Sequence, residues 1–315
     1  MRYVQYTRQG RAHPAVLYKD QVINLSRLLR LMQHPAAGNM HSLRTFIEAG
    51  EALWSALRDR LETIDLQVLA SKLPLYPVGE VTLDAPLRNT HKLILLAGNY
   101  REHIREAGFR VPESSERITP QFFMKPPSTT VIGPGQPICL PRNGVWVDWE
   151  VELAVVIGKR GRHIPASQAM SFVFGYTIVN DVSERRYNSQ ISNRFLREKD
   201  PFMDWLHGKW FDTFAPMGPA VVTPGEIPDP HNLRLALRRN GKLEQDANTS
   251  QMLHGVPYLI HKLSEIMTLE PGDVIATGTP AGVGHSKGIF LKAGDIIECH
   301  IEGIGTLTNP VVAEE

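Results

Sequence analysis

The sequence of 315 residues contains only two cysteines, Cys139 and Cys299, and neither belongs to a C-x-x-C motif or a Cys/His cluster. This sparse usage is typical of a protein from a reducing compartment and gives no sign of a disulfide framework. The N-terminus lacks an apolar signal segment, and no stretch approaches the roughly 18 uninterrupted apolar residues that cross a bilayer. We therefore expect a cytoplasmic protein without a membrane partner.

An excess of charge of either sign is also missing. The chain has 34 lysines and arginines against 33 aspartates and glutamates, a formal net charge of +1, which gives no electrostatic reason to expect nucleic acid as a partner. The glycine-rich stretch Thr277–Gly284 has neither the G-x-G-x-x-G nor the G-x-x-x-x-G-K-[ST] order, so binding of nucleotide phosphates is disfavoured. The expected partner is a small molecule.

What the chain does contain is an acidic strand over residues 147–158. Alternation places Asp148, Glu150 and Glu152 on one face and apolar side chains on the other. Carboxylates aligned in this way repel and desolvate one another unless a cation offsets their charge, which makes the strand a candidate metal site. The alternative is a half-exposed strand whose acids face water.

A second apolar strand, over residues 170–181, ends at Asp181. This aspartate either caps a helix expected over residues 182–186 or supplies a third carboxylate to the same site. Sites that bind a metal through oxygen alone take carboxylates and carbonyls from separate parts of the chain, which favours the second interpretation if a metal is present.

A short helix over residues 101–108 carries His103 and Glu106. Because they are three residues apart, the carboxylate can orient or charge the imidazole. The alternative is an incidental pair on a solvated helix. Two lysines follow or adjoin aromatic residues: we expect Lys125 to reach the surface, whereas Lys209 either reaches water or pairs with an anion in a site.

The pattern also predicts how the chain is organised. Residues 1 to about 75 alternate as short strands and then show helical spacing, with Ser26 and Ser42 as candidate helix caps. A proline-punctuated connector follows, which predicts a small N-terminal domain with its connector over residues 1–86 and a larger domain over 87–315. Within the latter, Asn240-Gly241 predicts a hairpin turn, followed by a helix over 256–267.

Taken together, these motifs resemble the fumarylacetoacetate hydrolase family. The matching stretches are 98–106, 147–158, 175–183, 209–219 and 273–284, which follow the order of the family across roughly residues 90–309. The resemblance implies a mostly β fold with helices (α+β), a mixed β-roll preceded by a small N-terminal α+β domain, and a homodimer.

The resemblance also implies roles for the site residues. Glu150, Glu152 and Asp181 match the ligands of a Mg²⁺ or Mn²⁺ ion, a choice that hard oxygen donors favour. His103 and Glu106 match the pair that activates water, and Lys209 a catalytic lysine. The expected substrate-binding group is Thr279, Gly278, Lys125 and Asn188. One departure concerns specificity: Arg186 and Asn188 stand where the family often has aspartate and glutamine.

The expected activity is metal-dependent hydrolysis of a carbon–carbon bond in a 2,4-dioxo acid of the acylpyruvate type. Two alternatives use the same site, decarboxylation of oxaloacetate-type acids and isomerisation or hydration of 2-oxo-enoates in aromatic or sugar-acid catabolism. A remote alternative is a metal-binding protein without catalytic activity.

Overall fold

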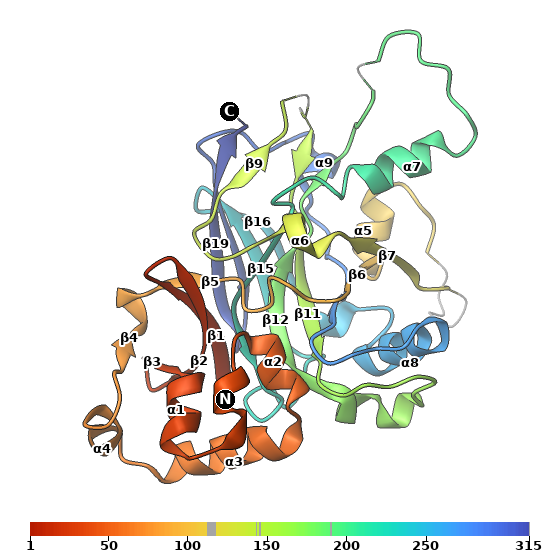
Figure 1. Ribbon diagram of the computed structural model, residues 1–315. Helices are drawn as coiled ribbons and strands as arrows, with labels where there is room; N and C mark the ends of the chain where they lie inside the picture. Colours follow the sequence, from red (N-terminus) through yellow and green to blue (C-terminus); the bar gives the residue numbers. More distant parts are fainter. Residues whose placement is uncertain (112–117, 143, 145, 190, 315) are drawn as a thin grey trace.

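β-Strands form two packed sheets in the computed structural model of the chain, which describes residues 1–111, 118–142, 144, 146–189 and 191–314 (Figure 1). The sheets contact each other where β14 meets β19 and β11 meets β15. Among the described residues, none of the helices has the length and hydropathy required to span a bilayer.

The large sheet runs the width of the molecule and is mostly antiparallel, with a parallel pairing between β17 and β6. In spatial order its strands are β4 (Tyr76–Pro77), β3 (Gln21–Asn24), β2 (Arg11–Tyr18), β1 (Arg2–Arg8), β14 (Ala215–Val222), β12 (Val173–Asn180), β11 (Val151–Ile157), β17 (Val274–Ala276), β6 (Leu93–Ala97) and β7 (Gln121–Lys125). Two short strands pair at its side, β5 (Thr82–Asp84) with β1 and β8 (Val131–Ile132) with β14.

The smaller sheet packs against the middle of the large one. Its strands are β16 (Lys242–Asn248), β15 (Arg234–Arg239), β18 (Ile296–Ile301), β19 (Gly305–Ala313) and β9 (Ile138–Leu140). A separate ribbon pairs β10 (Val147–Asp148) with β13 (Ser183–Glu184).

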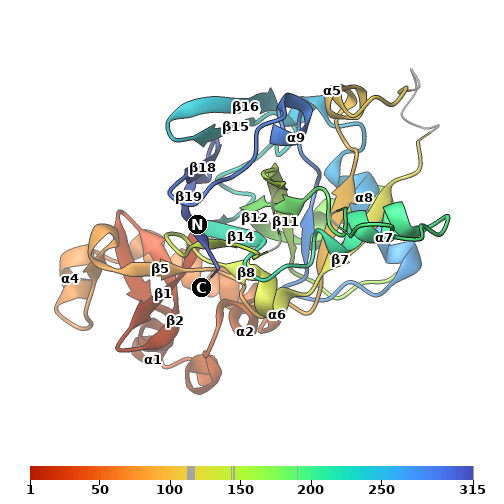
Figure 2. The same cartoon turned by 90° about the horizontal axis from the view of Figure 1, so that it is seen from above.

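Some helices lie beside the N-terminal strands, and the others are spread over the rest of the molecule (Figures 1 and 2). Those that flank the N-terminal strands are α1 (Leu25–Leu31), α2 (Leu43–Glu48), α3 (Glu51–Thr63) and α4 (Leu66–Ala70). Those of the remaining chain are α5 (Arg101–Glu106), α6 (Pro127–Thr130), α7 (Asp200–His207), α8 (Val256–Ile266) and α9 (Gly284–Lys287).

Strand β11 separates two hydrophobic cores. Val151, Leu153 and Val155 point into the core shared with the smaller sheet, whereas Ala154 and Val156 point into the core shared with the N-terminal helices. This confirms the predicted alternation, because the odd-numbered apolar side chains from 147 to 157 all lie in the first core. The mixed α+β architecture predicted from the sequence is likewise confirmed.

The N-terminal strands extend the sheet of the remaining chain. Tyr3 of β1 pairs with Val221 of β14 in antiparallel register. Its ring packs on Phe46 of α2 and on Phe174 of β12, with ring centroids 5.0 and 5.3 Å away. The sheet and one core therefore cross the boundary that the sequence predicts between residues 86 and 87, and that division stays a prediction.

Several local predictions are confirmed and two are wrong. Asn240 and Gly241 have φ angles of 52° and 77°, as a type I′ turn requires, and Ser42 caps α2 through its side chain. Ser26, however, lies inside α1, because Asn24 is the residue whose side chain accepts from the Arg27 N–H. The helix expected over residues 182–186 is absent, because Ser183 and Glu184 pair instead with β10.

Candidate active site

Three buried carboxylates meet where β11 begins and β12 ends. Pairing of the two strands aligns these ends. Two hydrogen bonds of 2.9 Å hold them together: the Asp181 N–H donates to the Glu150 carbonyl, and the Glu150 N–H donates to the Asn180 side-chain oxygen. One ligand atom from each of Glu150, Glu152 and Asp181 lies within 4.8 Å of the others. The three residues are at most 5% exposed, so the alternative of a strand whose acids face water is wrong.

Asp148 lies apart from this group, because the predicted strand is interrupted at Trp149 and Glu150. One carboxylate oxygen of Asp148 accepts from the Gly284 N–H at 2.6 Å, and the other from the His285 N–H at 2.8 Å. Asp148 therefore anchors the start of α9.

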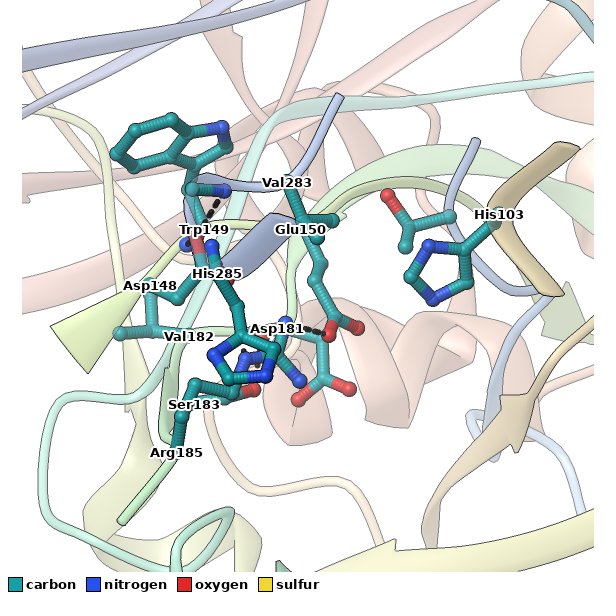
Figure 3. Close-up of polar contacts among 12 residues, drawn as sticks. His103, Asp148, Trp149, Glu150, Asp181, Val182, Ser183, Arg185, Val283 and His285 are labelled. Carbon is teal, nitrogen blue, oxygen red and sulfur yellow. Dashed lines mark hydrogen bonds and ion pairs between the residues drawn. The ribbon is translucent and has the colours of Figure 1, made fainter. Parts of the chain in front are cut away.

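Two buried lysines and the partly buried Arg185 surround the carboxylates. The Lys209 Nζ donates to Glu150 Oε2 at 3.1 Å and to Asp181 Oδ2 at 2.6 Å. Arg185 binds Asp148 through its Nε at 3.0 Å and Glu150 through its Nη2 (Figure 3). Lys125, only 1% exposed, forms an ion pair with Asp181 at 2.6 Å.

Glu150 and Glu152 differ in their contacts with the cations, and their pKa values shift in opposite directions. Burial would raise the pKa of Glu150, but Lys209 and Arg185 outweigh it and hold that pKa below its usual range. Glu152 accepts a hydrogen bond from the Gly278 N–H at 2.8 Å and forms no ion pair within the part of the chain that the structure describes. Burial, followed by repulsion from Asp181 and Glu150, raises the pKa of Glu152 well above its usual value.

This arrangement fits a divalent cation. The donor set consists of carboxylate oxygens alone, as Mg²⁺ and Mn²⁺ prefer, and contains no imidazole or thiolate. The four carboxylates, counting Asp148, outnumber by one the adjacent cations Lys125, Lys209 and Arg185, and a metal ion at this position would favour the ionised form of Glu152.

The predicted His103–Glu106 pair is formed on α5. The Nδ1 of His103 lies 2.8 Å from Glu106 Oε1, and the other Glu106 oxygen accepts from the Gly282 N–H at 2.9 Å and the Ser286 hydroxyl at 3.0 Å. Burial opposes ionisation of Glu106, but these partners outweigh it and lower its pKa. In Figure 3 the His103 ring lies on the opposite side of the Glu150 carboxylate from Arg185.

A cavity of about 980 Å³ joins these groups. Its polar walls include His103, Glu106, Glu150, Asp181, Arg185, Lys209, His254, Thr279, His285 and Ser286. Its apolar walls include Leu96, Ile104, Phe109, Ile118, Phe123, Phe202, Trp205 and Val283. The metal centre and the acid–base pair therefore face one shared space.

The predicted substrate-binding residues divide into two groups. Thr279 lines the cavity, with its hydroxyl 2.9 Å from the Val151 carbonyl, whereas Gly278 lies behind the cavity wall and donates its N–H to Glu152. Among the residues that the structure describes, Lys125 and Asn188 do not line the cavity. The Asn188 amide donates to Asp204 at 2.9 Å, and Lys125 lies buried behind Asp181, so the expectation that this lysine reaches the surface is wrong.

Three further residues that line the cavity are not predicted from the sequence: Arg185, His254 and His285. Arg185 follows Asp181 by four residues. An arginine this close in sequence to an expected ligand is a candidate partner for the carboxylates of the site. His254 and His285 are isolated histidines, and no local pattern distinguishes them.

Comparison with known proteins gives the family. The description of the matching family is "Fumarylacetoacetate (FAA) hydrolase C-terminal", and the match covers residues 92–312. The oxaloacetate tautomerase Fahd2a, mitochondrial, of Rattus norvegicus is 42% identical over 269 residues, which are 85% of this chain and 78% of the relative.

Two solved structures show the same fold. The 2-hydroxyhepta-2,4-diene-1,7-dioate isomerase from Mycobacterium marinum is 38% identical with a TM-score of 0.63, over 76% of this chain and 81% of that one. The maleylpyruvate hydrolase from Sphingobium sp. SYK-6, in complex with manganese(II) and pyruvate, is 28% identical with a TM-score of 0.74 and full coverage of both chains. The relatives include a tautomerase, an isomerase and a hydrolase, and this chain belongs to the fumarylacetoacetate hydrolase family.

Proposed function

We propose that this chain is a divalent-metal-dependent enzyme that enolises a 2-oxo acid, and that its reaction is keto–enol tautomerisation of an oxaloacetate-type dicarboxylic acid. The observation that carries this proposal is the cavity in which Glu150 and Asp181 face the His103–Glu106 pair. The reaction named for the rat relative supports the choice of substrate.

The residues of the chain supply the proton chemistry. When bound, Mg²⁺ or Mn²⁺ would supply Lewis acidity toward the carboxylate and 2-oxo oxygens of the substrate. His103, oriented by Glu106, takes the proton from C3 and returns it to the 2-oxo oxygen, so that atoms and charge balance. The ammonium of Lys209 offsets the negative charge that develops on that oxygen.

The test follows the decay of enol-oxaloacetate by its ultraviolet absorbance, with the protein and added Mg²⁺. We expect decay faster than the buffer-catalysed rate, and a loss of about 10²- to 10⁴-fold in His103→Ala. His300→Ala, an exposed histidine on the smaller sheet, is the matched control. Wild-type protein that binds Mg²⁺ and leaves the rate at the buffer value contradicts the proposal.

Hydrolysis of an acylpyruvate is the second candidate, and the volume of the cavity favours it. Pockets of about 300–1,000 Å³ hold drug-sized ligands, and a four-carbon diacid fills only part of such a space. Here His103 would deprotonate a water that attacks the 4-carbonyl, and the C3–C4 bond would break to give pyruvate and a second acid. A product assay separates this outcome from tautomerisation, which releases nothing, and from decarboxylation, which releases carbon dioxide.

The identity of the metal, the oligomeric state and the cellular location remain predictions. The solved neighbour that holds manganese(II) supports a divalent cation and leaves the choice between Mg²⁺ and Mn²⁺ to a metal assay. The homodimer stays a prediction for light scattering to test. The cytoplasmic location also stays a prediction, and the mitochondrial location in the name of the rat relative belongs to that protein.

A further inference from the structure

Arg186 carries a positive charge that the proposed chemistry does not use, at a position where the family often has an aspartate. The side chain is exposed, and its guanidinium lies over the indole of Trp146, 3.6 Å from the ring centroid. The ring covers one face of the guanidinium, whereas the N–H groups lie around its edge. Because no carboxylate of the described residues forms an ion pair with Arg186, these N–H groups are free for an acceptor.

Glu184 lies next to this pair, but its carboxylate is already used by the backbone. One oxygen of Glu184 accepts from the Arg186 N–H at 2.9 Å, and the other accepts from the Trp146 N–H at 3.1 Å. Glu184 therefore holds the two residues at a set position and leaves the guanidinium without a counter-ion.

His285 connects Arg186 to the cavity. Its ring lines the cavity wall and forms no hydrogen bond within the described part of the chain, whereas its backbone N–H is held by Asp148. Phe290 links the two residues, because its ring centroid lies 4.5 Å from that of Trp146 and 6.4 Å from that of His285. The side chains from His285 to Arg186 therefore form a continuous rim at this end of the cavity.

The charges around His285 favour an anion. Burial, followed by the charge of Arg185, lowers the pKa of His285. Arg186 acts in the same direction, and Asp148 and Glu106 oppose it only in part. The ring is therefore neutral at neutral pH and offers one N–H donor. Since the carboxylates of the site already neutralise Arg185, the uncompensated positive charge at this rim belongs to Arg186.

We propose that Arg186 and His285 form a subsite that binds the distal carboxylate of a 2-oxo diacid, the one farther from the 2-oxo group. In Figure 3 the His285 ring lies on the opposite side of the Glu150 carboxylate from His103, so a substrate at the metal centre lies between the two histidines. A four-carbon acid fills only part of the cavity of about 980 Å³, so the diacids that reach this subsite are longer than oxaloacetate. The proposal rests on the proposed function, because it requires the near end of the substrate at the carboxylates.

The test uses Arg186→Met, which keeps an apolar chain to pack on Trp146, and His285→Phe, which keeps a ring beside Phe290. Calorimetry with added Mg²⁺ measures three probes: oxalate, which has only the chelating atoms, and the six-carbon pair 2-oxoadipate and 2-oxohexanoate, which differ in the distal carboxylate. We expect Arg186→Met to lose about tenfold in affinity for 2-oxoadipate and His285→Phe to lose about threefold, because a hydrogen bond to a charged group is the stronger one. The affinities for oxalate and 2-oxohexanoate should change less than twofold.

Arg8→Met is the matched control, because Arg8 is also exposed and lies over a ring, that of Tyr76, at 4.3 Å from its centroid. All three variants change exposed positions, so their melting temperatures without ligand should stay close to that of the wild type. The inference is overturned when wild-type protein binds oxalate but does not prefer 2-oxoadipate to 2-oxohexanoate, or when Arg186→Met changes the binding of 2-oxoadipate no more than Arg8→Met does. Wild-type protein that binds Mg²⁺ but not oxalate overturns the proposed function instead.

Discussion

Glu152 is a carboxylate that favours metal binding and lowers the stability of the fold. It is 1% exposed, it forms no ion pair with the described residues, and it lies beside Glu150 and Asp181. A buried charge without compensation destabilises the fold, and the same charge attracts a cation. Lys209 and Arg185 stabilise the neighbouring carboxylates and leave this one for the metal.

Replacement of Glu152 by glutamine should therefore separate the two effects. In EDTA we expect the melting temperature of Glu152→Gln to equal or exceed that of the wild type, because the amide keeps its shape and can still accept from Gly278. Added Mg²⁺ should raise the melting temperature of the wild type and leave that of the variant unchanged. A variant that is less stable in EDTA and still responds to Mg²⁺ contradicts this account of the site.

Glu106 gives a prediction for pH. Its pKa lies below the ordinary value of 4.5, so its ionised form stabilises the folded state above about pH 4.5, and this contribution is lost as the pH falls through the lower folded pKa. Glu106→Gln should melt about 2–4 °C below the wild type near neutrality, and the difference should shrink below pH 4.5. Calorimetry from pH 3 to 7 measures this, and a constant difference contradicts it.

The loop from Thr277 to Gly284 brings the backbone to the carboxylates. Gly278 has a φ of +92°, and a Cβ there would lie 2.8 Å from the Asn99 Cβ, so only glycine lets its N–H reach Glu152. A methyl group at this position would push the loop away from β11.

We expect Gly278→Ala to lose about 1–3 kcal/mol of stability from backbone strain, to lose more from the clash with Asn99, and to bind Mg²⁺ more weakly. Gly294→Ala is the matched control, because Gly294 has a φ of +93° with no atom within 4 Å of the added Cβ. Chemical denaturation and metal titration compare the two variants. Equal losses of stability and of Mg²⁺ affinity in the two variants would contradict the role assigned to the close approach of Gly278 and Asn99.

How far the sequence predicts these elements depends on the range of the interactions that form them. The alternation along β11 and the Asn240-Gly241 turn are local, so the pattern predicts them. The interruption at Glu150 depends on the Asn180 side chain, which lies thirty residues away along the chain, and no local pattern contains it. The segment after Asp181 is polar enough for a helix, but pairing with Val147 and Asp148 overrides that preference.

For the candidate site, the same distinction applies to side chains. The spacing of His103 and Glu106 on a short helix is local and was sufficient to predict their contact. The burial of Lys125 depends on Asp181 and on two carbonyls from distant segments, so the sequence favoured the surface instead. The position of His254 in the cavity wall is likewise a property of the packed fold.

The continuous sheet links the N-terminal strands to the rest of the chain. β1 covers the edge of β14, and Tyr3 closes a core that also contains Phe174 and Met217. We expect the full chain to unfold in one cooperative transition, and residues 87–315 alone to aggregate, because removal of β1 exposes a strand edge and an apolar face. Scanning calorimetry and expression of the shortened chain test this. Cooperative unfolding of soluble residues 87–315 would show an independent domain.

The lysines and the arginine around the carboxylates have a kinetic consequence. Because Lys125, Lys209 and Arg185 pair with Glu150, Asp181 and Asp148, we expect these side chains to keep their positions without help from a cation. Loading is then a simple encounter without a refolding step: after rapid mixing with Mn²⁺, occupancy should rise in a single exponential phase without a lag, at a rate proportional to the concentration of the ion.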